Sequence, residues 1–191
     1  MIQTLANSLA EYIAKNDETA NKEELAYGYG LIFMAITIYA TVLLSALLFG
    51  VFAKMLIAVG AFTLMRATVG GCHVNHRAVC IASYTGIAYL AIFLSGILYL
   101  NLYAIAALYL VNVILLTLYA PGDTEEQPMV HWRLARNVVG LILISAIFSL
   151  SLILRDMQVE TNIAILTSTA NSIYLHPYIY KAYRCKRSKY K

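Results

Sequence analysis

Two long stretches without a charged side chain dominate this sequence of 191 residues. The first runs from Ala26 to Ala53, and the second runs from Ala78 to Gly122. Because a helix needs about 20 apolar residues to cross a bilayer, the first stretch is long enough for one crossing and the second for two. Neither stretch alternates apolar with polar residues as a barrel strand does, so the expected membrane-spanning elements are helices.

The composition excludes several other classes of protein. Only 13% of the residues are charged and 61% are hydrophobic, whereas a soluble domain carries about 25% charged residues. An ordinary cytoplasmic globule, a disordered tail and a secreted disulfide scaffold are therefore not expected. The net charge of +4 is modest, and the chain has no polar domain on which basic residues cluster, so nucleic-acid binding is not expected either.

The positions of the charges predict an all-α, polytopic membrane protein with six transmembrane helices. We expect one membrane domain over residues 26–180, followed by a basic tail over residues 181–191. The sixth apolar segment is more polar than the others and contains Asn162, Asn171, Ser172 and His176. The predicted spans are residues 28–50, 51–66, 79–100, 102–120, 137–155 and 161–180.

Residues 1–25 differ from the rest of the chain. Leu5, Leu9, Tyr12 and Ile13 recur at helical spacing, and acidic residues occupy many of the intervening positions. This pattern predicts an amphipathic N-terminal helix that lies on the membrane surface and does not cross it.

The distribution of Lys and Arg predicts the orientation. If the N-terminus is cytoplasmic, twelve of the 14 Lys and Arg residues lie inside, and only Lys54 and Arg155 lie outside. Cytoplasmic loops of membrane proteins carry an excess of such residues. We therefore expect a multi-pass protein of the plasma membrane with both termini and both longer polar loops in the cytoplasm.

The segment between the second and third predicted spans concentrates chemically reactive residues. From Arg66 to Cys80 it holds two His, two Cys, two Arg and the pair Gly70-Gly71. Ionisable groups at membrane depth are costly and usually functional. The residue types alone leave three interpretations open: a zinc site, nucleophilic catalysis by a cysteine that a histidine activates, and a purely structural role. The ligands of a metal site would be Cys72, His73, His76 and Cys80.

Helix geometry restricts the catalytic interpretation. In one continuous helix His73 and Cys80 would lie about 10 Å apart, beyond hydrogen-bond reach. A His73–Cys80 pair therefore requires a break after His73 and a new helix that begins near Arg77 or Ala78. Cys80 would then lie in the first turn, where the positive end of the helix dipole stabilises a thiolate.

Two motifs in the chain resemble those of the AgrB family (accessory gene regulator protein B). The first is the pattern R-x3-G-G-x-H-x6-C, formed by Arg66, Gly70, Gly71, His73 and Cys80 between two spans. The second follows the fourth span and contains Tyr119, Pro121, Asp123, Thr124 and Pro128. AgrB proteins are membrane cysteine endopeptidases of Gram-positive bacteria that process the AgrD quorum-sensing propeptide, and the resemblance extends over essentially the whole chain.

The resemblance implies a mechanism and partners. Cys80 would be the nucleophile and His73 the base, and cleavage would release the C-terminal tail of an AgrD-like propeptide. The resulting thioester would pass its acyl group to an internal Cys or Ser of the substrate, which closes a thiolactone or lactone ring. No cofactor and no metal is expected, and the partners are the propeptide and membrane lipids. Whether the protein forms a homodimer stays open.

The supporting roles have alternatives. Gly70 and Gly71 would direct backbone N–H groups at an oxyanion or simply form a turn. Arg66 would bind the substrate's acidic tail or the developing charge, or anchor the helix at the interface. Asp123 would orient His73 as a third catalytic residue or shape its turn.

Two other functions remain as alternatives, and three residues receive no function. The rival functions are a small transporter that exports the peptide and a metal-dependent membrane enzyme. The disfavoured rival is the transporter, because only the sixth span is visibly polar. Each of the three cysteines is considered singly, and Cys72, His76 and Cys185 are assigned no function.

Overall fold

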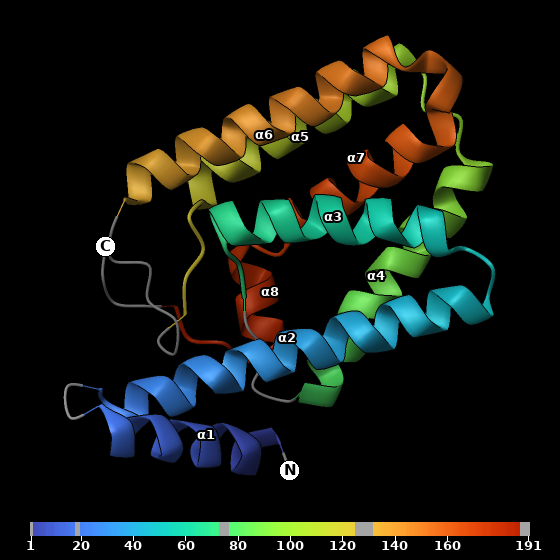
Figure 1. Cartoon of the computed structure of the whole chain (residues 1–191). Coiled ribbons are helices and arrows are strands. Elements are labelled where there is room, and N and C mark those ends of the chain that lie inside the picture. The colour runs from blue at the N-terminus through green and yellow to red at the C-terminus, as the bar shows by residue number, and fades with distance from the viewer. Residues whose placement is uncertain (1, 18–19, 73–76, 125–131, 188–191) are drawn as a thin grey trace. The chain divides into compact units, whose positions relative to one another are not determined.

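The computed structural model describes residues 2–17, 20–72, 77–124 and 132–187, and this part of the chain contains helices and one isolated β-bridge (Figure 1). This confirms the all-α prediction. The chain forms two compact units, which are residues 1–50 and residues 51–191. The helices are α1 (Ile2–Asn16), α2 (Lys22–Leu48), α3 (Phe52–Val69), α4 (Arg77–Ile97), α5 (Leu102–Tyr119), α6 (Arg133–Ile153), the 3-10 helix η1 (Arg155–Met157), α7 (Gln158–Ile173) and α8 (Pro177–Ala182).

Five of the described helices, α2 to α6, are long and apolar enough to cross a membrane. They identify a multi-pass membrane protein. The predicted count of six spans is not confirmed, because α7 has only 16 residues and a non-helical turn separates it from α8. The His176 side chain accepts a hydrogen bond from the Tyr178 backbone N–H at 3.3 Å, and Pro177 takes the first helical position, where its missing N–H costs nothing. The domain limits drawn from the sequence stay a prediction.

The unit of residues 1–50 is a pair of helices, with α1 packed along the first half of α2 (Figure 1). The Asn21 side chain caps α2 by accepting a hydrogen bond from the Glu23 N–H at 3.0 Å. In α1, the apolar side chains Leu5, Leu9 and Tyr12 stay exposed while Ala6 and Ala10 are buried. The predicted contact of this helix with the membrane surface stays a prediction.

One ion pair joins α1 to the start of α2. The Lys22 ammonium lies 3.3 Å from a carboxylate oxygen of Glu11, and Lys15 lies 3.5 Å from the other oxygen. The hydrogen bond from Lys22 lowers the pKa of Glu11 below its ordinary value, and Lys15 lowers it further. Because all three side chains are at least half exposed, the pair contributes little to stability.

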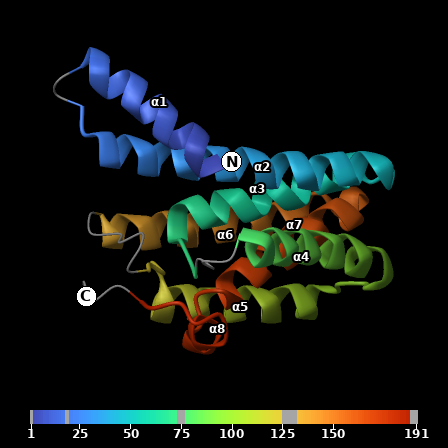
Figure 2. The ribbon, with the colours of Figure 1, turned by 90° about the horizontal axis from the view of Figure 1, so that it is seen from below.

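In the unit of residues 51–191, α7 packs against α3, α4, α5 and α6, as the view in Figure 2 shows. Lipid offers no hydrogen bonds, so polar side chains in a membrane are expected to face the interior of a bundle. The outward faces of α4, α5 and α6 expose large apolar side chains such as Phe93, Leu110 and Ile142. The buried polar residues of α7 are Asn162, Thr167, Ser168, Thr169, Asn171 and Ser172.

A hydrophobic cluster holds the helices of this bundle together. Its buried members come from α3, α5, α6 and α7, and from Leu175 just after α7. At Gly140 of α6 the side chain of Val69 leaves no room for a Cβ atom, so α3 and α6 approach closely there. The cluster comprises Met65, Val69, Leu116, Ile144, Phe148, Ile165 and Leu175.

Candidate functional site

The two sequence motifs meet at the end of the bundle where α3 and α5 stop. Gly70 and Gly122 form a parallel β-bridge. The Gly71 N–H donates to the Gly122 carbonyl at 2.9 Å, and the Gly122 N–H donates to the Val69 carbonyl at 2.8 Å. The chain after α3 is therefore joined by its backbone to the chain after α5, although 52 positions separate Gly70 from Gly122.

The glycines at this junction permit a close approach of the two backbones. Gly71 has φ +138°, a conformation that other residues rarely adopt, and a Cβ atom there would lie 2.6 Å from Arg66 Nη1. A Cβ atom on Gly122 would lie 3.1 Å from the Gly71 Cα atom and 2.7 Å from the Tyr180 hydroxyl. In this arrangement the Gly70 N–H donates to the Arg66 carbonyl at 3.0 Å, so neither Gly70 nor Gly71 has an N–H free for an oxyanion.

Arg66, in the last turn of α3, connects this junction to the thiol. Its guanidinium donates a hydrogen bond to the Cys72 carbonyl, which fixes the segment that leads toward His73. The same guanidinium interacts electrostatically with Cys80. Of the two roles expected for Arg66, this position favours a role inside the site over a simple interfacial anchor.

Cys80 lies in the first turn of α4, is half-buried, and is the free cysteine of the described residues. Among the described residues α4 begins at Arg77, and the break after His73 that the helix argument requires lies outside them. One turn later, the Ser83 hydroxyl lies 3.1 Å from the Tyr183 hydroxyl, which itself lies 3.1 Å from the hydroxyl of Tyr174. A short chain of hydroxyl groups thus leads from Ser83 of α4 to Tyr183 after α8 and Tyr174 after α7.

The expected base His73 lies outside the described residues, as do Pro128 and His76, which belongs only to the metal hypothesis. In the sequence, His73 directly follows Cys72 and precedes α4. The predicted metal ligands include both histidines, so the described residues do not test the metal hypothesis.

Asp123 is buried, with 4% of its side chain exposed, and it forms an ion pair with Arg133 at the start of α6. The distance from Asp123 Oδ2 to Arg133 Nη1 is 3.2 Å. The site expected from the sequence does not include Arg133, because the pair depends on how the loop between α5 and α6 folds.

The C-terminal segment contacts the site, which the sequence reasoning did not anticipate. Arg187 donates to the Tyr119 carbonyl at 2.9 Å and lies over the Tyr180 ring at 5.1 Å from its centroid. The only sequence signal was the recurrence of tyrosine at the end of the sixth predicted span and the start of the basic tail, with Tyr174, Tyr178, Tyr180 and Tyr183.

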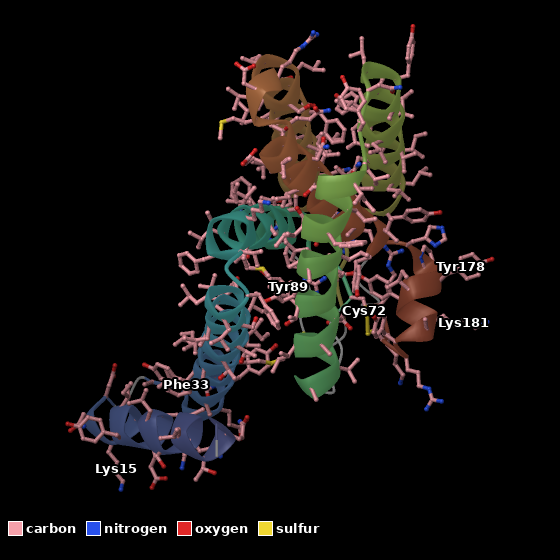
Figure 3. All side chains as sticks on the ribbon, turned by 90° about the vertical axis from the view of Figure 1, so that its right-hand side faces the viewer. Lys15, Phe33, Cys72, Tyr89, Tyr178 and Lys181 are labelled. Atoms are coloured by element: carbon pink, nitrogen blue, oxygen red, sulfur yellow. A yellow bond between two sulfur atoms is a disulfide. The ribbon has the colours of Figure 1, made fainter. Side chains whose placement is uncertain are left out.

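The prediction that the three cysteines act separately was wrong. Cys72 and Cys185 are joined by a disulfide that links the segment after α3 to the C-terminal tail, and Figure 3 labels Cys72. The physical reason is topological. Because α7 returns the chain to the end of the bundle where α3 stops, α8 brings Cys185 beside a residue that is 113 positions earlier.

These observations define a class: a multi-pass helical membrane protein with a cysteine in the first turn of α4, beside two loops joined through glycine backbones. The sequence matches the family described as "Accessory gene regulator B" over residues 6–176. It is also 28% identical over 160 residues to a "Putative AgrB-like protein" of Clostridium acetobutylicum, which covers 83% of this chain and 76% of that protein. No solved structure matches the chain.

Because the family match extends over most of its length, the chain belongs to the accessory gene regulator B family. Membership associates it with the processing of accessory gene regulator quorum-sensing peptides and implies a propeptide substrate of the AgrD type.

Proposed function

We propose that this protein is a membrane cysteine endopeptidase that cleaves and cyclises an AgrD-like propeptide. The Cys80 sulfur attacks the carbonyl carbon of the bond that follows the last residue of the signal peptide. His73 accepts the thiol proton and then donates it to the departing amine of the acidic tail. An internal Cys or Ser of the substrate then attacks the thioester, which closes the ring and returns Cys80 to its thiol form.

The observation that carries this proposal is the backbone junction between Gly70–Gly71 and Gly122. It brings the two family motifs together, and the hydrogen bond from Arg66 to the Cys72 carbonyl ties the end of α3 to the segment that precedes α4 and Cys80. A half-buried thiol at a helix N-terminus suits a nucleophile better than a fully buried cysteine does.

The half-buried position of Cys80 also suits ring closure. Transfer of an acyl group from one thiol to another is nearly balanced in free energy, so the ring forms only if water is excluded from the thioester. The exposed apolar faces of α4 and α5 place this end of the bundle in contact with lipid, which supports such exclusion. Binding of the internal nucleophile near the acyl carbon supplies the remaining advantage.

Arg66 is the proposed binding group for the oxyanion or the substrate's acidic tail. The N–H groups of Gly70 and Gly71 already donate within the fold, so we assign these glycines to the close approach of the two loops. Asp123 is the proposed third residue. Its Oδ2 pairs with Arg133, and its Oδ1 is the oxygen that would accept a hydrogen bond from His73.

We further propose that α7 and α8 together make the sixth crossing, with both termini in the cytoplasm. The buried polar face of α7 requires protein on all sides, and α7 has it from α3, α4, α5 and α6. The excess of Lys and Arg on one side of the predicted topology supports the orientation. The active site then lies at the cytoplasmic boundary, where an amphipathic precursor reaches it from the membrane surface.

The test is cleavage of an AgrD-type precursor by the purified protein in liposomes, followed by mass spectrometry. Wild type should release the tail and a cyclic product, and Cys80→Ala should release neither. Cys185→Ser, which removes a sulfur that the proposed chemistry does not use, is the matched control and should retain cleavage under reducing conditions. A precursor without its internal nucleophile should leave a thioester adduct on Cys80.

The same assay separates the alternatives. Cleavage that survives Cys80→Ala would refute the cysteine peptidase, and cleavage lost on treatment with a chelator would favour the metal-dependent enzyme. Uptake of intact precursor into the liposomes without cleavage would favour the transporter.

A further inference from the structure

The disulfide between Cys72 and Cys185 joins two sulfur atoms that the proposed reaction leaves without a role. The Cα atoms of the two cysteines lie 6.3 Å apart, within the range of about 4.4–6.8 Å that a disulfide requires. Cys72 is buried next to the segment that holds His73, whereas Cys185 is half-buried in the tail. The backbone therefore needs no large movement to form or release the bond.

The tail is held at the site by further contacts. The Cys185 N–H donates to the Tyr180 carbonyl at 2.8 Å, and Arg187 donates to the carbonyl of Tyr119, where α5 ends. Tyr183 contacts the hydroxyl of Ser83 at 3.1 Å. Ser83 lies three positions after Cys80, so the two residues share a face of α4. The tail thus lies beside the face that carries the nucleophile.

We propose that Cys72 and Cys185 form a reversible thiol-oxidation site. Its disulfide fastens the C-terminal tail beside Cys80 and slows cleavage of the precursor, while its dithiol form releases the tail. This inference rests on the proposed peptidase activity only for its effect on rate. At a cytoplasmic site the reduced dithiol is the ordinary form, and cytosolic disulfides, where they occur, are usually transient and redox-sensing.

The oxidant is a low-molecular-weight disulfide, and the exchange balances. The Cys185 thiolate, the more accessible of the two, attacks one sulfur of the oxidant and releases one small thiolate, which leaves a mixed disulfide on Cys185. The Cys72 thiolate then attacks the Cys185 sulfur and releases the second small thiolate. Two protons from the two cysteines and two electrons pass to the oxidant, which becomes two small thiols.

The oxidised form should restrict access of the precursor to Cys80, because the disulfide makes the other contacts of the tail form together. Each hydrogen bond of Tyr183 or Arg187 is weak alone, but a covalent bond at Cys185 makes re-formation of the others intramolecular. A precursor that approaches Cys80 must then displace a fastened segment, and we expect cleavage to be roughly tenfold slower in the oxidised form.

The experiment uses the full chain in liposomes, treated with either oxidised glutathione or dithiothreitol. Three quantities are measured: the Cys72–Cys185 crosslink by non-reducing peptide mapping, the rate at which trypsin cuts after Lys181 and Arg184, and the rate of precursor cleavage. Oxidation should form the crosslink, protect the tail from trypsin and slow cleavage, and dithiothreitol should reverse all three. In Cys185→Ser the same oxidant should change none of them by more than about twofold.

Several results would overturn the proposal. They are a crosslink that does not form, a crosslink that leaves the tail as sensitive to trypsin as before, and an oxidised wild type that cleaves as fast as the reduced one. Equal inhibition of Cys185→Ser by the oxidant would attribute the effect to Cys80 and would also overturn it.

Failure of the proposed peptidase function is distinguishable from failure of the proposed thiol-oxidation site. If the reduced wild type does not cleave the precursor, the peptidase assignment fails. The crosslink and the protection of the tail from trypsin then decide by themselves whether the thiol-oxidation site fastens the tail.

Discussion

The two ends of the unit of residues 51–191 contain similar polar residues but use them differently. At the site end, Arg66 bonds a loop carbonyl, Arg133 pairs with Asp123, and glycine backbones join two loops. At the opposite end, residues from α5, α6 and α7 line a cavity of about 200 Å³, and Arg155, which lines it, pairs with no described residue.

The asparagines at the opposite end serve the ends of helices. The Asn101 side chain caps α5 by accepting a hydrogen bond from the Ala104 N–H at 2.9 Å, and Asn162 donates to the Leu98 carbonyl at 3.2 Å. Such bonds satisfy backbone groups that a helix end leaves unpaired. The comparison shows that polar residues alone do not mark a functional site in this bundle. Close contact between backbones, with ionic groups fixed around it, is what distinguishes the site end.

The largest expected effect comes from filling the glycine junction. Gly122→Ala places a Cβ atom 3.1 Å from the Gly71 Cα atom, where backbone must move, and 2.7 Å from Leu175 Cδ2. We expect precursor cleavage to be abolished and the protein to be destabilised by about 1–3 kcal/mol, the usual cost of overpacking. Cleavage and thermal unfolding in detergent measure the two effects.

Gly96→Ala is the matched control for this prediction. Gly96 lies in α4 toward the opposite end, and a Cβ atom there would meet nothing within 4 Å. Alanine in a helix interior is favoured over glycine by about 1 kcal/mol, so this variant should keep full activity and equal or greater stability. Similar losses in both variants would show that the two ends tolerate added volume equally.

A smaller effect is expected when the buried ion pair is broken. Arg133→Gln leaves the carboxylate of Asp123, which is 4% exposed, without its cation. A buried polar group that loses its partner costs about 1–3 kcal/mol, and Arg133 is itself 33% exposed, so the lower part of this range is expected. The midpoint of thermal unfolding should fall accordingly.

The double variant Asp123→Asn with Arg133→Gln tests what Asp123 does. Removal of both charges should recover most of the stability lost in Arg133→Gln alone. If Asp123 orients His73, the double variant is stable but cleaves slowly, and its pH–rate profile is altered. A stable double variant with wild-type cleavage and an unchanged profile would reduce Asp123 to a residue that positions its loop.

The fold was predictable where lipid dictates the pattern. Charge-free stretches predicted α2, α4 and α5 because a bilayer tolerates few other sequences. The final segment was harder, because Asn162, Asn171 and His176 make it too polar to be read as an ordinary span. Its polarity is explained by burial of α7 among four helices, which depends on tertiary packing that no local pattern encodes.

The site was predictable only in part, for a related reason. The stretch from Arg66 to Cys80 was singled out by its local composition, and its Gly70 and Gly71 are joined by backbone to Gly122 of the second motif. The contacts between distant segments were missed, because the Cys72–Cys185 and Asp123–Arg133 pairs depend on which helix ends meet. The return of α7 to the site end determines the first of these pairs.

The smallest expected effect lies at the opposite end and completes the comparison. Arg155→Gln removes a cation that pairs with no described residue, so precursor cleavage should stay within about twofold of wild type and stability within about 0.5 kcal/mol. Arg66→Gln is the same substitution at the site end, where it removes the hydrogen bond to the Cys72 carbonyl, and it should slow cleavage by more than about tenfold. If Arg155→Gln slows cleavage as much as Arg66→Gln does, the cavity at the opposite end takes part in the reaction and the distinction between the two ends is wrong. If only Arg66→Gln is slow, the fixed geometry around an arginine, and not its charge alone, determines where this bundle does its chemistry.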